Sequence, residues 1–241
     1  MRLIMSIALT TITFAGPAWA LTPMGAPTAQ LKSGQVRFAV TYGYSENDIV
    51  ISNRGAKVTY DDFELQTELA TISWGLATER AEVFARLGTS SIEIEDQADD
   101  FRSGIEFAGG IGTRITTNLG SALSWGVLGQ CTWYQGEDDW VVLGAAGNAE
   151  IDAYEIQVAA GPCWKSENLC IYGGPFAHIV EGDLDLEVAG VTNSYDIDED
   201  SGFGGYVGLT AKLRRDLSMI AEFQITADAY LITAGVTFAV E

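Results

Sequence analysis

Apolar and polar residues alternate with a period of two along most of this sequence. In residues 36–43, Val36, Phe38, Val40 and Tyr42 fall on one side of an extended chain, with Arg37 and Thr41 among the residues on the other. About ten segments share this pattern, and they start near residues 34, 65, 80, 103, 121, 150, 168, 202, 217 and 229. Because successive side chains of a strand point to opposite faces, the alternation predicts an all-β chain whose strands have one apolar and one polar face.

The segment that starts near residue 65 departs from this pattern. Its apolar residues change face between Leu69 and Ile72. An extra residue in one strand of a pair shifts the alternation by one position. We therefore expect a β-bulge between these two residues.

The connections between segments alternate in length. Short turns are expected at 78–79, 117–120, 165–168 and 214–216, and longer acidic loops at about 45–63, 91–102, 135–149 and 182–201. The connection near residues 227–228 breaks this alternation because it is also short. Short turns at one end and long loops at the other are typical of transmembrane β-barrels. We expect an up-and-down antiparallel barrel of about ten strands, with eight as the alternative.

The N-terminus has the pattern of a secretory signal peptide. A positive start, Met1-Arg2, precedes a mostly apolar run over 3–15, and Ala18-Trp19-Ala20 is an A-x-A cleavage signal. The sequence therefore predicts a Sec signal peptide over 1–20, cleaved after Ala20. We expect residues 21–33 to be a periplasmic lead and residues 34–241 to form one barrel domain.

The charge of the chain argues against nucleic acid as a partner, and its hydropathy allows a membrane-spanning structure of one kind only. The net charge is −20 and the pI is near 4.2, which argues against nucleic acid. No segment after the signal peptide has eighteen apolar residues in a row, so a membrane could be crossed only by a closed barrel of strands.

Charges of both signs recur on the polar faces of the segments, with glycine and alanine between them. This composition suits a narrow lumen filled by paired side chains, with the apolar faces turned to lipid. The expected lumen charge network comprises Arg37, Glu82, Arg86, Glu106, Arg114, Glu155, Lys212 and Glu222. The alternative is a soluble periplasmic carrier like the lipocalins, in which the apolar faces would line the inside.

A signal peptide followed by amphipathic β segments up to the C-terminus resembles the small Gram-negative outer-membrane β-barrels, the OmpA-like and opacity-type group. The resemblance implies a monomer in the outer membrane, in contact with its lipid and lipopolysaccharide. It also implies a structural or surface-interacting role, such as envelope integrity, adhesion or ion exchange. A narrow channel or porin is the nearest alternative.

Two cysteines flank the expected turn at 165–168. A hairpin turning there brings Cys163 and Cys170 opposite or nearly opposite each other, within reach of a disulfide. We predict this disulfide, which would stabilise the barrel by about 2–3 kcal/mol. Free thiols or a metal or redox site are the alternatives, and Cys131 is left over on the lipid side.

One group of residues could carry catalysis. His178 is followed by Glu181, Asp183 and Asp185, and a histidine beside carboxylates can act as a base. The omptin proteases place acidic residues and a histidine at the outer rim of a barrel, so an omptin-like enzyme is an alternative. We favour a histidine in the lumen below an acidic loop, and expect neither enzymatic activity nor a cofactor.

The acidic loops could attract hard cations. Carboxylate oxygens are the ligands that calcium and magnesium prefer, and Asp196, Asp198 and Asp200 are weak candidates for a site. Because their spacing is not that of an EF-hand loop, solvated loops are the leading interpretation. Diffuse Ca²⁺ or Mg²⁺ bridging to lipopolysaccharide phosphates is the alternative.

Overall fold

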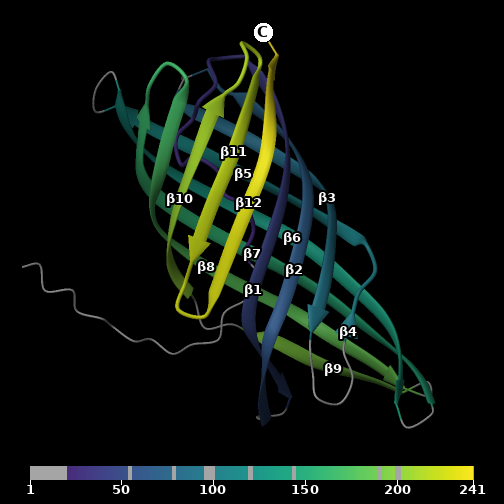
Figure 1. Ribbon diagram of the computed structural model, residues 1–241. Helices are drawn as coiled ribbons and strands as arrows, with labels where there is room; N and C mark the ends of the chain where they lie inside the picture. The colour runs from purple at the N-terminus through teal and green to yellow at the C-terminus, as the bar shows by residue number, and fades with distance from the viewer. Residues whose placement is uncertain are drawn as a thin grey trace, which may run out of the picture.

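The computed structural model describes residues 21–53, 56–77, 80–94, 101–118, 122–142, 145–188, 191–198 and 202–240. These residues form one sheet of strands (Figure 1). The strands are β1 Val36–Asn53, β2 Ala56–Gly75, β3 Ala81–Ile94, β4 Phe101–Arg102, β5 Glu106–Asn118, β6 Leu123–Val142, β7 Ala145–Lys165, β8 Leu169–Val188, β9 Val191–Asp198, β10 Gly202–Lys212, β11 Leu217–Ile225 and β12 Ala229–Val240. Within the described residues, no helix could span a bilayer.

Ten of the strands close into an antiparallel barrel, as the alternation predicted. Each pairs with the next barrel strand along the chain, and β12 closes the ring by pairing with β1 from Val36↔Val240 to Asn47↔Ala229. Strand β8 pairs directly with β10, so that β9 lies outside this ring. Strand β4 also lies outside it, and pairs with β3.

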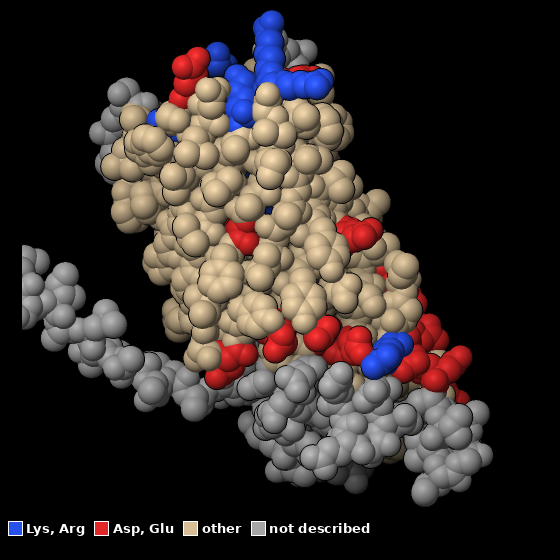
Figure 2. Space-filling model, in the orientation of Figure 1, with Lys and Arg blue, Asp and Glu red and all other residues tan. Residues whose placement is uncertain are grey.

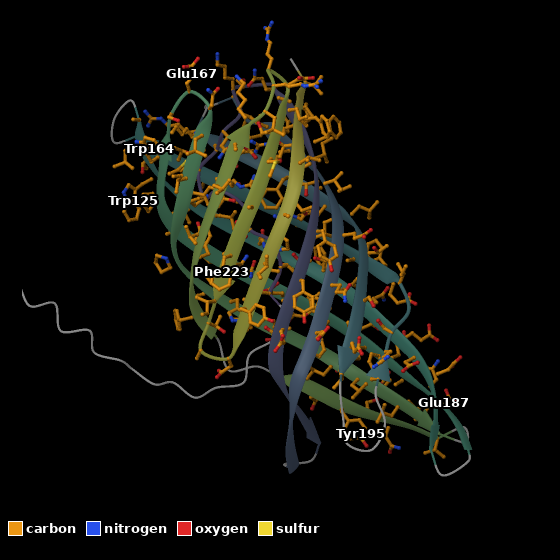
Figure 3. All side chains as sticks on the ribbon, in the orientation of Figure 1. Trp125, Trp164, Glu167, Glu187, Tyr195 and Phe223 are labelled. Atoms are coloured by element: carbon orange, nitrogen blue, oxygen red, sulfur yellow. The ribbon has the colours of Figure 1, made fainter. Side chains whose placement is uncertain are left out.

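The outer wall of the barrel is apolar around its middle. Figure 2 shows a broad, largely uncharged belt, with most Lys and Arg at the end that carries the short turns and most Asp and Glu toward the other end. Large apolar side chains are exposed all along this belt, among them Val40, Leu87, Val127 and Val207. Trp125 and Trp164 project outward near the short-turn end (Figure 3). This is the orientation of a transmembrane barrel and the opposite of a lipocalin-like carrier.

Most of the stretches expected to be long loops are strand instead. Strands β1, β2, β6, β7 and β8 continue far beyond the short strands β10, β11 and β12. There β9 pairs with β8 on one side and with β1 on the other, at Ile51↔Ile197 and Ser52↔Asp196. Strand β4 pairs with β3, and the N–H of Arg102 donates to Asp138 of β6. We call this extension, residues 44–69, 89–104, 134–153 and 180–198 where described, the distal barrel.

The distal barrel reverses the polarity of the wall. Along β2, Leu65 and Leu69 are buried inside, whereas Ile72 and Trp74 face outward. The expected bulge between Leu69 and Ile72 is wrong, because the β2–β3 register runs unbroken from Phe63↔Ile94 to Gly75↔Glu82. The physical reason is the change of solvent: lipid requires an apolar outer face, while water requires an apolar inner one. The core of the distal barrel comprises Phe63, Leu65, Leu69, Ile92, Tyr134, Ile151, Val180, Leu184 and Ile197, among others.

Candidate functional site in the barrel lumen

Residues 21–31 lie inside the transmembrane barrel, and we call them the lumen segment. Leu21 is 1% exposed and Met24 is 0% exposed. This location corrects the expectation that residues 21–33 form a lead outside the barrel. The lumen of ten mainly polar inner faces offers donors and acceptors to an extended chain, which has no strand partner of its own.

Two glycines let the lumen segment fit. Gly25 has a φ of +77°, a conformation that other residues rarely adopt. On the wall, a Cβ at Gly126 of β6 would lie 2.3 Å from the carbonyl oxygen of Pro27. The segment therefore passes close to bare backbone at this point.

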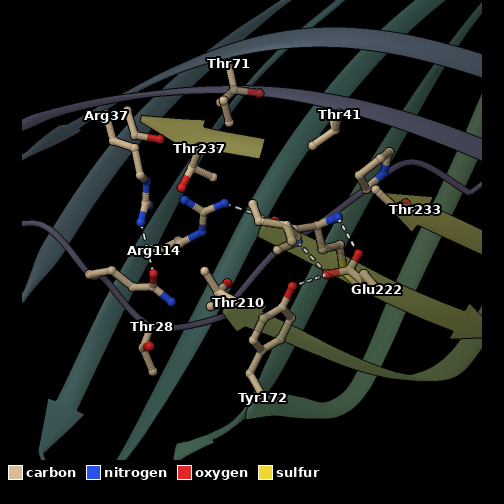
Figure 4. A pocket seen from close by; sticks show the side chains of 18 of the residues that line it. Thr28, Arg37, Thr41, Thr71, Arg114, Tyr172, Thr210, Glu222, Thr233 and Thr237 are labelled. Carbon is tan, nitrogen blue, oxygen red and sulfur yellow. Dashed lines mark hydrogen bonds between the residues drawn. The ribbon is translucent and has the colours of Figure 1, made fainter. Parts of the chain in front are cut away.

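Glu222 of β11 anchors the middle of the lumen segment. Its carboxylate accepts hydrogen bonds from the backbone N–H groups of Met24 (2.9 Å) and Gly25 (2.8 Å). The Tyr172 hydroxyl (3.2 Å) and the Gln224 amide (2.9 Å) donate to the same carboxylate, as Figure 4 shows in part. Four donors compensate for the desolvation of this buried charge.

Glu82 of β3 is the centre of a second cluster. Its Oε1 lies 2.8 Å from Arg37 Nη2 and 2.6 Å from Arg114 Nη1, while the N–H of Gln30 donates to its Oε2 (3.0 Å). Arg114 also donates through Nη2 to the carbonyl oxygen of Met24 (3.0 Å). One buried carboxylate on β3 thus joins β1 and β5 to the lumen segment.

Glu155 of β7 forms the third buried acidic position. The hydroxyl of Thr22 donates to its Oε2 (2.6 Å), and Nδ1 of His178 lies 3.7 Å from its Oε1. The side chains of His178 and Glu155 are both fully buried. His178 is therefore in the lumen, as we favoured from the sequence.

Three glutamines that the sequence analysis did not single out as site residues complete the contacts. Gln130 donates to the carbonyl oxygen of Pro23 (3.2 Å) and Gln224 donates to that of Thr22 (2.9 Å). Gln157 accepts a hydrogen bond from Gln130. The period-two alternation of the sequence predicts that these glutamines lie on the polar inner faces. No sequence feature indicated that they would bind the lumen segment.

The structure brings six of the eight predicted network residues into the lumen: Arg37, Glu82, Arg86, Arg114, Glu155 and Glu222. Arg86 and Arg114 both lie against the ring of Phe84, at 4.7 and 4.3 Å from its centroid. The other two residues are at strand ends. Glu106 is half-buried where β5 begins, and Lys212 is exposed where β10 ends.

The structure separates His178 from the acidic residues that follow it. His178 points into the lumen, whereas Glu181 and Asp183 are exposed on the outer face. Side chains that are an odd number of positions apart along a strand point to opposite faces, and these two residues are three and five positions after His178. The omptin-like arrangement of a histidine with these carboxylates is therefore not assembled.

Of the three candidate cation ligands, only Asp196 has a described side chain. Asp196 is exposed on β9, the side chain of Asp198 is not described, and Asp200 lies outside the described residues. No group of three or more His, Cys, Asp or Glu suited to a metal ion occurs among the described residues.

The cysteines are free thiols in the structure, and the disulfide stays a prediction. Cys163 pairs with Tyr172 and Cys170 pairs with Lys165, so the two cysteines are diagonal neighbours across the β7–β8 hairpin. Gln30 of the lumen segment donates to Cys170 Sγ (3.6 Å). Cys131 is half-buried on the outer face.

We expect Cys163 and Cys170 to be joined when the protein is isolated from an oxidising compartment. Mass spectrometry of a non-reduced digest should find the two peptides linked, with Cys131 available for alkylation. Recovery of alkylated Cys163 without reduction would contradict this prediction. A Cys131→Ser variant is the control, because it should leave the linkage unchanged.

Comparisons with known proteins agree with this architecture. No family model matches the sequence, and no curated protein matches it. Among solved structures, the translocator domain of the autotransporter NalP from Neisseria meningitidis matches with a TM-score of 0.53 and 10% identity, covering 87% of this chain and 90% of that one. The chain has the fold of an outer-membrane β-barrel. A second such barrel, the outer membrane protease OmpT from Escherichia coli, matches with a TM-score of 0.50 and 8% identity over 91% of this chain and 99% of that one.

Proposed function

We propose that this outer-membrane β-barrel is a closed barrel with a structural or surface-interacting role, exported by its signal peptide and monomeric in the membrane. The observation that carries the proposal is the filled lumen. The lumen segment occupies the transmembrane barrel and bonds to Glu82, Glu155 and Glu222. Beyond it, the apolar core of the distal barrel fills the interior a second time.

The outer face of the distal barrel is the surface that we propose for interaction. Exposed Asp152, Asp183 and Asp196 lie directly opposite one another on β7, β8 and β9, and Gln135 of β6 continues the row. A surface groove of about 640 Å³ contains this row together with Trp133 and Tyr154. Like charges placed opposite each other are unfavourable. We propose that Ca²⁺ or Mg²⁺ of the lipopolysaccharide layer screens them diffusely.

The proposed role is not enzymatic. The support is geometric: the one histidine of the chain is buried in the lumen, and the carboxylates that follow it point to the outside. A narrow channel remains the alternative function, because the lumen is lined by polar residues that a rearrangement of the lumen segment would expose.

Planar bilayer recordings distinguish the two functions. The folded protein should insert into the bilayer without stepwise conductance, because the lumen segment and the apolar core of the distal barrel both obstruct the path through the barrel. A variant lacking residues 22–30 should also remain closed, since the distal core persists, and a gel shift on heating would confirm that it is folded. Regular conductance steps from the unaltered protein would contradict the proposal and favour the channel.

A further inference from the structure

Strand β9 is the edge of the sheet over most of its length. On one side it pairs with β8 along its whole length. On the other side it pairs with β1 only at Ile51↔Ile197 and Ser52↔Asp196, just before β1 ends. Among the described residues, no strand pairs with 191–195 on this second side. We call residues 191–195 the open edge, and they lie at the end of the barrel opposite the short turns (Figure 1).

The open edge presents backbone hydrogen-bonding groups. The β8–β9 hairpin closes at Val188↔Val191 across two residues, so Val191 directs its N–H and C=O toward β8. Because successive residues of a strand alternate in this respect, Thr192 and Ser194 direct theirs away from β8. Proteins commonly protect such an edge with Lys, Pro or a bulge. The open edge, VTNSY, contains no Lys or Pro, and its register with β8 is unbroken, so it can accept a further strand.

The two faces of the sheet beside the open edge differ in polarity. On the outer face, Thr192 and Ser194 lie opposite Glu187 and Asp185 of β8. On the inner face, Tyr195 packs against the core of the distal barrel. Glu187 and Tyr195 are labelled in this region in Figure 3. A strand added at the open edge would therefore have carboxylates beside one of its faces and apolar side chains beside the other.

The charge of this region favours one kind of added strand. Residues 181–200 contain eight Asp and Glu and no Lys or Arg. Neighbouring strands are about 4.8 Å apart, so Asp185 and Glu187 of β8 would lie about 10 Å from an added strand. Long Lys or Arg side chains of that strand can reach them across the short side chains of Thr192 and Ser194. A second copy of β9 would instead bring like charges together, which opposes self-association.

We propose that the open edge binds an extended segment of another protein, in which basic residues on the outer face alternate with apolar residues on the inner face. Backbone hydrogen bonds to Thr192 and Ser194 hold the segment, and the carboxylates of Asp185 and Glu187 select its basic side chains. In transmembrane barrels, the end opposite the short turns faces the outside of the cell. The proposal deepens the surface-interacting role proposed above and rests on it.

An octapeptide of alternating lysine and valine is the probe. The labelled peptide should bind to the folded mature protein in detergent micelles, as measured by fluorescence anisotropy, and high salt should weaken the binding. The same peptide with methyl groups on all its backbone nitrogens keeps its charges but has no N–H donors, and should bind at least about tenfold more weakly. An octapeptide of alternating glutamate and valine should not bind.

Two variants of one residue separate backbone pairing from side-chain contacts. Ser194→Pro removes an N–H from the open edge and should weaken binding of the lysine–valine peptide about tenfold. Ser194→Ala keeps the N–H and should bind the peptide like the unaltered protein. The double variant Asp185→Asn, Glu187→Gln should bind several-fold more weakly and with less dependence on salt. A gel shift on heating would confirm that each variant is folded.

Equal binding by Ser194→Pro and Ser194→Ala would overturn the proposal, because attraction to the acidic face alone would then explain the binding. Full binding of the methylated peptide would overturn it in the same way, and this test holds even if Ser194→Pro does not fold. Dimers of the protein that Ser194→Pro abolishes would replace the proposed partner with a second copy. None of these outcomes bears on the closed barrel, which the bilayer recordings test separately.

Discussion

Replacing Glu82 with alanine should lower the free energy of unfolding of the barrel by about 3–5 kcal/mol. Glu82 is fully buried, and its carboxylate is the ion-pair partner of both Arg37 and Arg114. The substitution leaves two guanidinium groups in the lumen without this partner, and it also removes an acceptor for the N–H of Gln30. Urea unfolding in detergent micelles, followed by tryptophan fluorescence, would measure the change.

Glu93→Ala is the matched control for Glu82→Ala. Glu93 also pairs with an arginine at 2.8 Å, but the side chains of Arg102 and Glu93 are 61% and 33% exposed. An exposed ion pair contributes about 0–1 kcal/mol, so this variant should be nearly as stable as the unaltered protein. Similar losses in the two variants would contradict the role that we assign to the buried cluster.

Replacing Phe63 with alanine should destabilise the distal barrel by about 3–5 kcal/mol. The ring of Phe63 is 0% exposed in the distal core, and its removal leaves a cavity there. The free energy of opening this part should fall by that amount, which corresponds to at least a ~100-fold faster cleavage by a protease that acts on the opened state. Limited proteolysis of the protein in vesicles would measure the rate.

Phe38→Ala is the contrasting variant, because the same residue type lies on the outer wall. Phe38 is 46% exposed on the belt that faces lipid, where acyl chains can fill the space that the ring leaves. The Phe38→Ala variant should therefore have the same rate of cleavage in the distal barrel as the unaltered protein. Equal sensitivity in the two variants would mean that the polarity of the wall does not reverse between Phe38 and Phe63.

The barrel itself could be predicted because its signal is local. Strands β3, β8, β10, β11 and β12 begin within a residue of their expected starts, since each has a full period-two pattern and a turn before it. The six lumen charges could be predicted for the same reason. Each occupies the polar face of a strand, and closing the ring brings all polar faces together.

The distal barrel and the lumen segment could not be predicted in this way. The acidic stretch that starts at residue 182 alternates too, but its apolar residues Leu184 and Leu186 lie on the inner face. This is the opposite of the pattern expected for a strand surrounded by lipid, so the stretch was interpreted as a loop. The lumen segment has no periodicity at all. Its partners are as far as 202 residues away along the chain, which is the separation of Gln224 from Thr22.

That separation restricts the order in which the molecule can be assembled. The segment that precedes β1 bonds to β11, one of the last strands to be synthesised. The seam between the first and last strands spans Val36↔Val240 to Asn47↔Ala229. Either the lumen segment lies between the strands before β1 pairs with β12, or it must later be threaded into a closed ring. The first route lets the wall form around a template, and it makes residues 21–31 a scaffold for the last strands of the barrel.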